Sequence, residues 1–235
     1  MINKIAVIGA AGFVGSALMK ALKEKGRYNV VPVVRNDYEQ LKQDQYDLII
    51  HTAMPSRRWW ALNNPLDDFE ASVGLTADIA YTWNYNKIAL ISSVSARVQR
   101  EHPYGRHKHL AEELLLNAGD ENLIFRLGGL YGEGLDKGVI FDMINGNQVF
   151  MTADSAFNYI DTYVAAKLMV DRLDKKGIVD IGAKNIISIG EIAEHFKLDV
   201  DFGDRKEFQD TQNPDEAYPD AREVLDYIEK LGIVK

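Results

Sequence analysis

The sequence of 235 residues contains no cysteine. This absence excludes disulfide bonds, thiolate catalysis and cysteine-ligated metal sites, and it favours the reducing cytoplasm as the compartment. No apolar run approaches the roughly 20 residues that span a bilayer, so we expect no membrane partner. Because Met1 leads directly into an apolar stretch, we also expect no signal peptide.

An excess of positive charge is missing as well. The 27 lysines and arginines are outnumbered by 35 acidic residues, which leaves a net charge of −8. Proteins that bind nucleic acid by general phosphate attraction are usually basic, so nucleic acid is not an expected partner. The five histidines do not have the spacing of metal ligands with acids nearby, and we expect no metal. Internal repeats and low-complexity tracts are also missing.

Strand-like runs alternate with helical patterns along the chain, which predicts an α/β fold with a parallel sheet. Strands are predicted at Ile2–Ile8, Asn29–Val34, Leu48–His51, Lys87–Ile91, Leu123–Arg126 and Ile178–Ile181. Helices are predicted at Phe13–Lys25, Leu66–Trp83, Tyr104–Asn117, Val139–Asn145, Thr162–Asp174, Ile189–Phe196 and Pro219–Leu231. The polar stretch 201–218 is expected to form a surface loop or part of a small cap.

Three glycines follow the first predicted strand at fixed spacing. Gly9 permits a sharp turn, Gly12 allows the backbone to approach a pyrophosphate, and Gly15 allows the next helix to pack closely. The free amides at the start of that helix, at Phe13 and Val14, would face the phosphates. The pattern therefore predicts dinucleotide binding, with a plain strand–turn–helix as the alternative.

The connection between the second and third predicted strands is unusually short. Only eleven residues, Asn36 to Tyr46, lie between Arg35 at the end of the second strand and Asp47 at the start of the next, and a helix, a strand and a second crossover do not fit there. We infer a doubly wound, Rossmann-type sheet that is one strand short, with the second strand at its edge. The whole chain, 1–235, is expected to form a single domain.

A tyrosine and a lysine lie four positions apart at the start of a predicted helix. Tyr104 and Lys108 project from one face of that helix, and Pro103 is a common helix start. A nearby ammonium favours the phenolate form of a phenol. A serine hydroxyl at the end of the preceding strand, Ile88–Ser93, can bind the same substrate oxygen. Together these groups can move a proton to or from a carbinol while a nicotinamide exchanges a hydride.

With these motifs in order, the chain resembles the extended short-chain dehydrogenase/reductases, the NAD-dependent epimerase/dehydratase group that acts mostly on nucleotide sugars. The motifs are Gly9-x-x-Gly12-x-x-Gly15, Leu48 to Ala53, Ile91-Ser92-Ser93, Tyr104-x-x-x-Lys108, Arg126 to Gly132 and Asn158 to Thr162. The resemblance covers nearly the whole chain. It implies a small substrate-binding region from residues of about 133–160 and 182–235.

The resemblance also implies roles for individual residues. Tyr104 would be the acid/base, and Lys108 would hold the nicotinamide ribose and lower the tyrosine pKa. Ser93 would orient the substrate, with Ser92 and Ser95 as competitors, and Ala53 would lie against the cofactor. Val94-Ser95 stands where dehydratases of the family carry an acidic pair, so elimination is disfavoured. A homodimer through the helices Leu66–Trp83 and Tyr104–Asn117 is a further expectation.

Two segments that contain arginine are candidates for binding the cofactor or the substrate. Arg35, at the end of the second strand, would suit a 2′-phosphate, which favours NADP over NAD. Asp37 could still reach a ribose, and Arg35 could be a solvated charge. The segment Arg57-Arg58-Trp59-Trp60 lies on the ligand side of such a sheet, and Arg57 and Trp59 are substrate candidates, as is Ser95. The alternative is a surface loop packed on the domain or on a second subunit.

The sequence thus predicts an NAD(P)-dependent oxidoreductase of the sugar-nucleotide epimerase/reductase type, with Tyr104 as acid/base. Its substrate would be a nucleotide sugar or a related hydroxy or keto compound. One alternative is a non-catalytic NAD(P)-binding regulatory protein on the same fold. Another is a binding partner within a larger complex.

Overall fold

The structure is a computed structural model that describes residues 2–232. The chain divides into two compact units. The first comprises residues up to Leu127 together with Ala166–Val179, and the second comprises Gly128–Ala165 together with the chain from Asp180 onward. Each unit has its own hydrophobic core.

The first unit is built on the six-stranded sheet, whose order is β12-β7-β6-β4-β1-β2. The strands are β1 (Lys4–Ile8), β2 (Asn29–Val33), β4 (Leu48–His51), β6 (Ile88–Ser93), β7 (Leu123–Leu127) and β12 (Gly177–Ile181). From β2 through β7 the neighbouring strands pair in parallel. The carboxyl ends of β1, β4 and β6 therefore lie at one edge of the sheet, where α/β folds bind their ligands.

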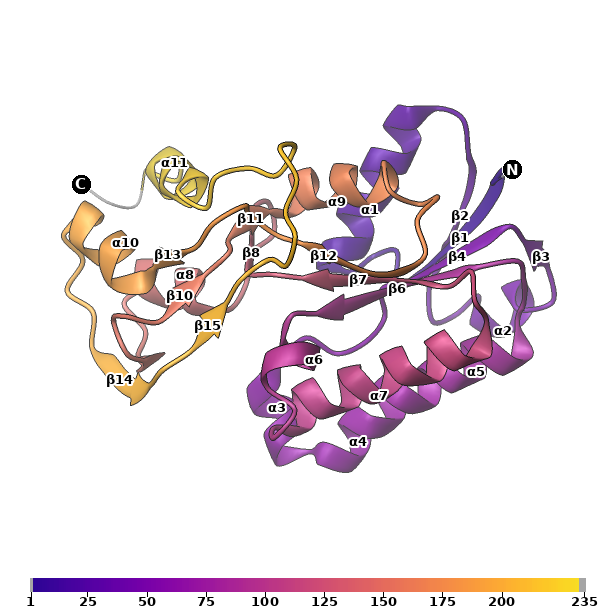
Figure 1. Ribbon diagram of the computed structural model, residues 1–235, viewed down its shortest axis with the longest axis horizontal. Coiled ribbons are helices and arrows are strands. Elements are labelled where there is room, and N and C mark those ends of the chain that lie inside the picture. Colours follow the sequence, from indigo (N-terminus) through magenta and orange to yellow (C-terminus); the bar gives the residue numbers. More distant parts are fainter. Residues whose placement is uncertain (1, 233–235) are drawn as a thin grey trace. The chain divides into compact units, whose positions relative to one another are not determined.

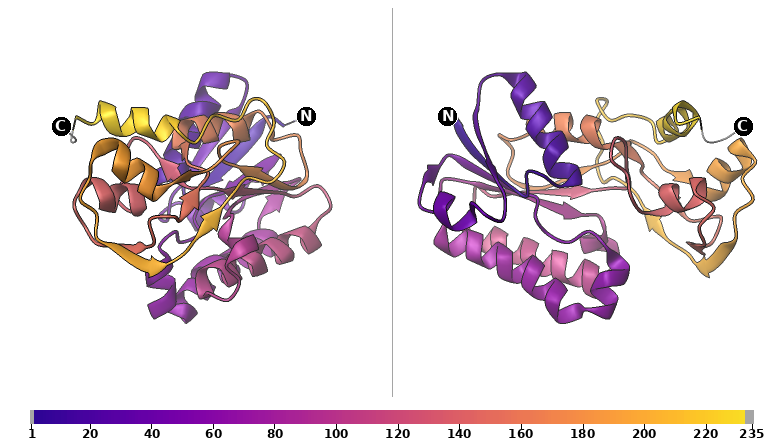
Figure 2. Two further views of the ribbon diagram at one scale, coloured as in Figure 1. Left: turned by 60° about the vertical axis from the view of Figure 1, so that its left-hand side comes forward. Right: turned by 180° about the vertical axis from the view of Figure 1, so that it is seen from behind.

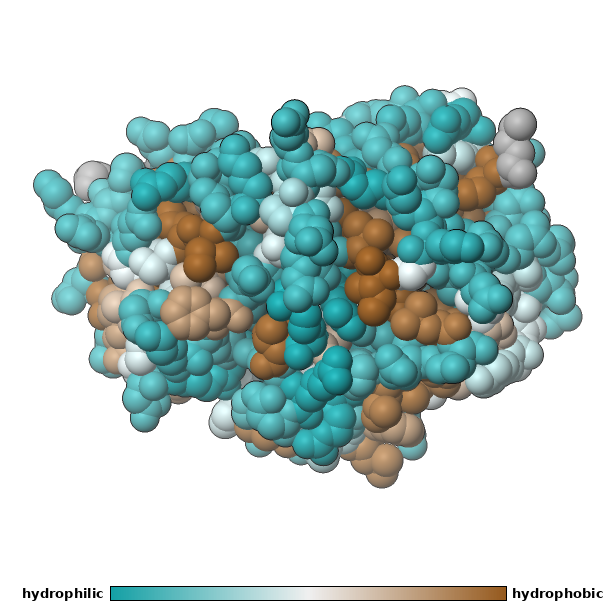
Figure 3. All heavy atoms as spheres, viewed as in Figure 1, coloured by the Kyte–Doolittle hydropathy of each residue, from teal (hydrophilic) through white to brown (hydrophobic). Residues whose placement is uncertain are grey.

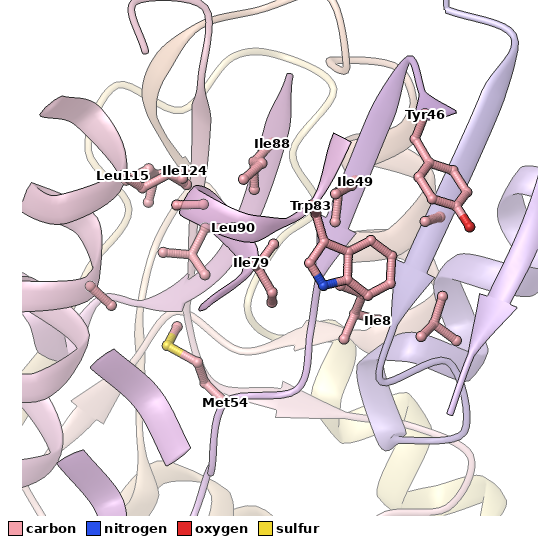
Figure 4. Close-up of a cluster of buried hydrophobic side chains, with 14 residues drawn as sticks. Ile8, Tyr46, Ile49, Met54, Ile79, Trp83, Ile88, Leu90, Leu115 and Ile124 are labelled. Atoms are coloured by element: carbon pink, nitrogen blue, oxygen red, sulfur yellow. The ribbon is translucent and has the colours of Figure 1, made fainter. Parts of the chain in front are cut away.

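Helices cover both faces of this sheet, which confirms the doubly wound prediction (Figures 1 and 2). One face is covered by α1 (Phe13–Lys25), and the other by α5 (Leu75–Thr82) and α7 (Pro103–Ala118). Figure 4 shows the core on the second side, where Ile49, Ile88 and Leu90 of the sheet pack among Ile79 of α5 and Leu115 of α7. Buried strands without polar alternation fit a sheet covered on both faces.

The prediction that one strand is missing is confirmed, because β2 is the last strand of the sheet order. The short connection forms α2 (Tyr38–Leu41) and β3 (Gln45–Tyr46), which pairs with β5 (Asn84–Tyr85) outside the central sheet. Asp78 of α5 holds this connection, accepting hydrogen bonds from the Tyr38 hydroxyl at 2.7 Å and from Lys42 Nζ at 3.0 Å.

Four segments differ from their predictions. The helix expected over 66–83 is interrupted, with α4 (Pro65–Phe69) followed by a π-helical turn, η1 (Glu70–Gly74), before α5. Two short helices, α3 (Arg58–Asn63) and α6 (Ser95–Val98), lie where the sequence predicts no helix. The stretch 201–218, expected to be a surface loop or part of a small cap, contains two strands that were not predicted, β14 (Phe202–Arg205) and β15 (Phe208–Gln209), because these residues pair with strands much earlier in the chain.

The second unit consists of short strands and helices around its own core. Its remaining elements are β8 (Leu130–Tyr131), α8 (Val139–Ile144), β9 (Val149–Met151), β10 (Ala156–Phe157), β11 (Ile160–Asp161), β13 (Ile187–Ser188), α10 (Ile189–Phe196) and α11 (Glu223–Lys230). Asp161 accepts hydrogen bonds from the amides of Tyr163 and Val164 at 2.8 and 3.0 Å, capping the start of α9 (Thr162–Val170). A helix cap of this kind satisfies amides that the helix itself leaves unpaired.

The surface carries mainly hydrophilic residues on the face shown in Figure 3, with small hydrophobic patches between them. Within residues 2–232, none of the helices has the length and apolarity to cross a membrane.

Candidate active site

The glycine turn brings the ends of three strands together. Gly9 follows β1 with φ +87°, a conformation that favours glycine, and a side chain there would lie 2.6 Å from Thr52 Oγ1. Its amide donates to Val33 O at 3.1 Å, and the Thr52 hydroxyl donates to Ile8 O at 2.9 Å. The backbone of this turn is therefore fixed by β2 on one side and by the residue after β4 on the other.

At the turn into α1, Gly15 leaves no room for a side chain, and a Cβ on Gly12 would fit only tightly, 3.3 Å from Gly9 O. A Cβ on Gly15 would lie 2.1 Å from Gly9 O, so the helix packs directly on the turn. Gly12 is the N-cap of α1 and provides no side-chain cap, and the first turn of the helix contains no acidic residue. The first amides of a helix have no intrahelical partner, and the helix dipole is positive at that end. These residues, including Phe13 and Val14, fit the pyrophosphate of a dinucleotide.

His51 lies at the carboxyl end of β4, next to this turn, and is fully buried. Its Nδ1 accepts a hydrogen bond from the amide of Ala53 at 3.3 Å, and its Nε2 lies 3.3 Å from Thr76 Oγ1. Because the Thr76 hydroxyl already donates to Ser72 O, the histidine must carry its proton on Nε2. Burial lowers the pKa of His51 to about 3, and the charge of Lys108 acts in the same direction. His51 is therefore a neutral scaffold residue that orients the Ala53 backbone.

Ser93, Tyr104 and Lys108 come together at the carboxyl end of β6. Ser93 is the last residue of that strand and hydrogen-bonds to the Tyr104 phenol. Lys108 Nζ lies 5.0 Å from the centre of the Tyr104 ring, and both side chains are buried. Gly105 makes this possible, because a Cβ there would lie 2.2 Å from Gln99 O at the end of α6. The short link before α7 thus packs directly against the first turn of that helix.

The three serines of this region have different surroundings. The Ser92 hydroxyl donates to Glu112 Oε1 at 2.5 Å, within a buried group in which Arg126 binds the same carboxylate at 2.6 Å. Ser95 is completely buried, and its Oγ has no hydrogen-bond partner among residues 2–232. Ser93 contacts the tyrosine, so the geometry favours Ser93 over Ser92 for the substrate-facing role.

The charge around Tyr104 comes from several elements. Burial raises the pKa of the Tyr104 phenol above its ordinary value. The guanidinium of Arg58, at the start of α3, and the hydrogen bond from Ser93 act to lower this pKa, and the Asp68 carboxylate acts to raise it. The Arg58 guanidinium lies 6.0 Å from the centre of the Tyr104 ring. The phenol thus lies among two cations and one carboxylate.

The carboxylate is itself paired. Asp68, in α4, is buried with its Oδ2 2.7 Å from Nδ1 of His107, and the ring of Phe69 packs edge-on against the same histidine. His107 precedes Lys108 on α7. Asp68 lies in the first turn of α4, where an acidic side chain stabilises the helix N-terminus. Its contact with His107 cannot be predicted from the spacing of residues on one helix, because the two residues lie on different helices.

The ligand-binding candidates at the periphery are more exposed. Arg35 lies in the turn after β2, two residues beyond Val33, which binds the Gly9 amide. Arg57 is the exposed N-cap of α3, and Trp59 is 75% exposed. Trp59 is therefore not packed into the core of the first unit. Among the described residues, no cluster of three or more histidines and acids could hold a metal ion.

Sequence reasoning did not single out Arg58, His51 or the pair of Asp68 and His107. His51 and Thr52 lie within the motif after β4, but their contacts depend on helices that follow later in the chain. Arg58 adjoins the predicted Arg57, and only the start of α3 at residue 58 determines which arginine faces the tyrosine.

Comparisons with known proteins identify the family of this chain. The model of the NAD dependent epimerase/dehydratase family matches residues 5–149. A reductase of UDP-2-acetamido-2,6-beta-L-arabino-hexul-4-ose from Pseudomonas aeruginosa is 28% identical over 222 residues, covering 81% of this chain and 56% of that protein. The chain thus spans little more than half the length of this curated relative.

Solved structures share the fold at low sequence identity. The dTDP-4-dehydrorhamnose reductase of Bacillus anthracis, in complex with NADP, superimposes with a TM-score of 0.78 at 15% identity, covering 98% of this chain and 99% of that one. MoeE5 in complex with UDP-glucose and NAD gives a TM-score of 0.79 at 18% identity, covering 98% and 100%. At this identity the likeness concerns the fold.

The fold and the site together define a Rossmann-type nucleotide-binding protein with a serine, a tyrosine and a lysine at the ligand edge of its sheet. The chain belongs to the NAD dependent epimerase/dehydratase family.

Proposed function

We propose that this protein is an NAD(P)-dependent oxidoreductase that transfers a hydride at a carbinol or ketone carbon of a nucleotide sugar. The observation that carries the proposal is the contact of Ser93 and Lys108 with Tyr104 at the sheet edge where β1 ends in the glycine turn. Family membership and the reductase relative support an oxidoreductase. The particular substrate of that relative is not carried over, because this chain spans 56% of its length.

In the proposed mechanism, each residue of the site acts on the reacting oxygen. A bound nicotinamide cofactor supplies or accepts the hydride. Ser93 holds the substrate oxygen by a hydrogen bond, and the Tyr104 phenol gives that oxygen a proton in reduction or takes it in oxidation. The positive charge of Lys108 would favour the phenolate, and its ammonium group would bind the ribose of the cofactor. Neutral His51 keeps the Ala53 backbone in place beside the turn.

NADP is the cofactor we favour. Arg35 lies in the exposed turn after β2, at the end of the sheet where the adenosine ribose of a dinucleotide binds, and a guanidinium matches a phosphate in a fork geometry. Similar folds are known with NADP and with NAD, so the fold by itself does not select one. The expectation to test is that Arg35→Ala weakens the binding of NADPH much more than that of NADH.

Chain segments near 133–160 and 182–235 are proposed to contribute to substrate binding, and Arg57, Trp59 and Ser95 are separate substrate candidates. The substrate class follows the nucleotide sugars named for the relatives. A homodimer is proposed through the helical face that exposes Leu66, Phe69 and Leu110. Figure 3 shows hydrophobic atoms at its lower edge, where α4 lies in Figure 1. The cytoplasmic location expected from the absence of cysteine stays a prediction.

A fluorescence titration of the purified protein with NADPH and NADH, followed by turnover assays on keto-sugar nucleotides, tests the proposal. Tyr104→Phe should bind NADPH like the parent protein and lose turnover by at least a factor of about 100, because only the proton donor is removed. A regulatory protein on this fold would bind the nucleotide and show no turnover with or without Tyr104. Binding of neither nucleotide would contradict the proposal.

A further inference from the structure

Two cations, not one, lie next to the Tyr104 ring. Lys108, one helical turn along α7, has its Nζ 5.0 Å from the ring centre. Arg58 comes from a different element, α3, and its guanidinium lies 6.0 Å from the same point. The Arg58 side chain is half-buried, whereas that of the preceding Arg57 is exposed, so the helix presents the two arginines differently.

Because Tyr104 is buried, a second cation beside it affects the ionisation of its phenol. The residue is only 8% exposed, and burial disfavours a charged phenolate. The groups that face it are Ser93 from β6, Lys108 from its own helix, Arg58 from α3 and Asp68 from α4. Asp68 opposes ionisation, although its Oδ2 is bound by His107 Nδ1 at 2.7 Å. His51, near Lys108, is neutral and adds no charge.

We infer that Arg58 is a positioning residue of the acid/base centre, whose guanidinium stabilises the Tyr104 phenolate and offsets the carboxylate of Asp68. The inference rests on the proposed function. In the reducing direction, a bound reduced nicotinamide would supply a hydride to the carbonyl carbon, and the π electron pair would move to the oxygen. The Tyr104 O–H bond then breaks, its proton joins that oxygen, and the negative charge stays on the phenolate until solvent returns a proton. Arg58 acts on that charge without contacting the reacting atoms.

The test is a titration of Tyr104 that needs neither cofactor nor substrate. A fluorinated tyrosine, whose phenol is more acidic than that of tyrosine, replaces Tyr104 in the full chain, and fluorine NMR follows its ionisation. A unit charge roughly 6 Å away at an effective dielectric constant of about 20 shifts an ionisation by on the order of one to two pH units. We expect Arg58→Gln to raise the titration midpoint by about one unit, and Arg58→Lys to raise it by less.

Arg57→Gln is the matched control, because it removes the same charge one residue away from an exposed side chain. It should leave the midpoint within about 0.2 units of the parent protein, since an exposed charge is largely screened. An unchanged midpoint in Arg58→Gln, or equal shifts in the two variants, would overturn the inference. If Arg58→Gln does not fold, Arg58→Met decides, because it also removes the charge, and an unchanged midpoint in that variant would overturn the inference. Failure to bind NADPH would refute the proposed function and leave this titration unaffected.

Discussion

His107 Nδ1 lies 2.7 Å from Asp68 Oδ2, and this buried contact joins α7 to α4 one residue before Lys108. It links the helix that carries the proposed acid/base to the segment that follows Arg58. Buried polar groups require partners, because an unpaired one is costly in the low dielectric of a protein interior. The pair therefore fixes the position of the first turns of α7 against α4.

Asp68→Ala should lower the free energy of unfolding by about 3 kcal/mol, because it leaves the buried His107 ring without its partner. The double variant Asp68→Ala/His107→Ala should lose less than the sum of the losses of Asp68→Ala and His107→Ala. Urea unfolding of the four proteins measures this coupling. Additive losses would show that the two side chains do not stabilise each other.

The serines provide a matched pair of substitutions at adjacent positions. Ser93→Ala should reduce turnover about 100-fold while NADPH binding is unchanged, because it removes the hydroxyl that contacts Tyr104. Ser92→Ala removes a hydrogen bond to Glu112, which keeps its Arg126 partner, so a loss of about 1 kcal/mol in stability with near-normal turnover is expected. Steady-state kinetics and urea unfolding distinguish them, and a catalytic loss in Ser92→Ala alone would reverse the assignment.

Two glycine-to-alanine substitutions test whether the packing of α1 on the glycine turn is needed for nucleotide binding. Gly15→Ala places a Cβ 2.1 Å from Gly9 O, which forces α1 away from the turn, so the Kd for NADPH should rise at least tenfold (about 1.4 kcal/mol). Gly74→Ala, in a helical segment with no atom within 4 Å of the added Cβ, should leave that Kd unchanged. Fluorescence titration measures both values. Equal affinities would mean that α1 does not position the phosphates.

The buried His51 should make the protein less stable in mild acid. Its pKa is about 3 in the folded protein and near 6.5 when unfolded, so the neutral form favours folding. Its contribution is complete above pH 6.5 and is lost as the pH falls from there toward 3. Between pH 8 and pH 5 the loss is about 2 kcal/mol, and His51→Asn should not show it. Urea unfolding at both pH values measures the difference, and parallel losses in the two proteins would contradict the expectation.

Much of the central sheet is predictable from local sequence patterns. The residues of α1, β4 and α10 agree with the predicted ranges at both ends, and the short connection after β2 correctly indicates a sheet edge. These features depend on apolar runs, glycine positions and chain length. The strands β14 and β15 were missed because their partners lie far away in the sequence, and short polar strands carry no distinct periodicity.

In the candidate site, too, local sequence patterns predict some features, and contacts between distant segments determine the others. The spacing of Tyr104 and Lys108 on one helix, and the serine at a strand end, are local signals that the structure brings together. The contacts of Arg58, Asp68 and His107 are not local, since they require α3, α4 and α7 to be packed against one another. Charges of this kind can be assigned only when the tertiary arrangement is known.

Pro32 gives the edge strand β2 a protection against self-association. The Asn29 amide and the Val33 carbonyl both bond toward β1, and backbone groups of alternate residues point to opposite sides of a strand. Pro32 therefore faces outward, where its missing N–H sacrifices no bond within the sheet. An edge strand normally presents a row of donors and acceptors on which a foreign strand can add. At the edge of this shortened sheet, Pro32 removes one of the outward-facing N–H donors of β2. A foreign strand therefore has one hydrogen-bonding site fewer on which to pair and aggregate.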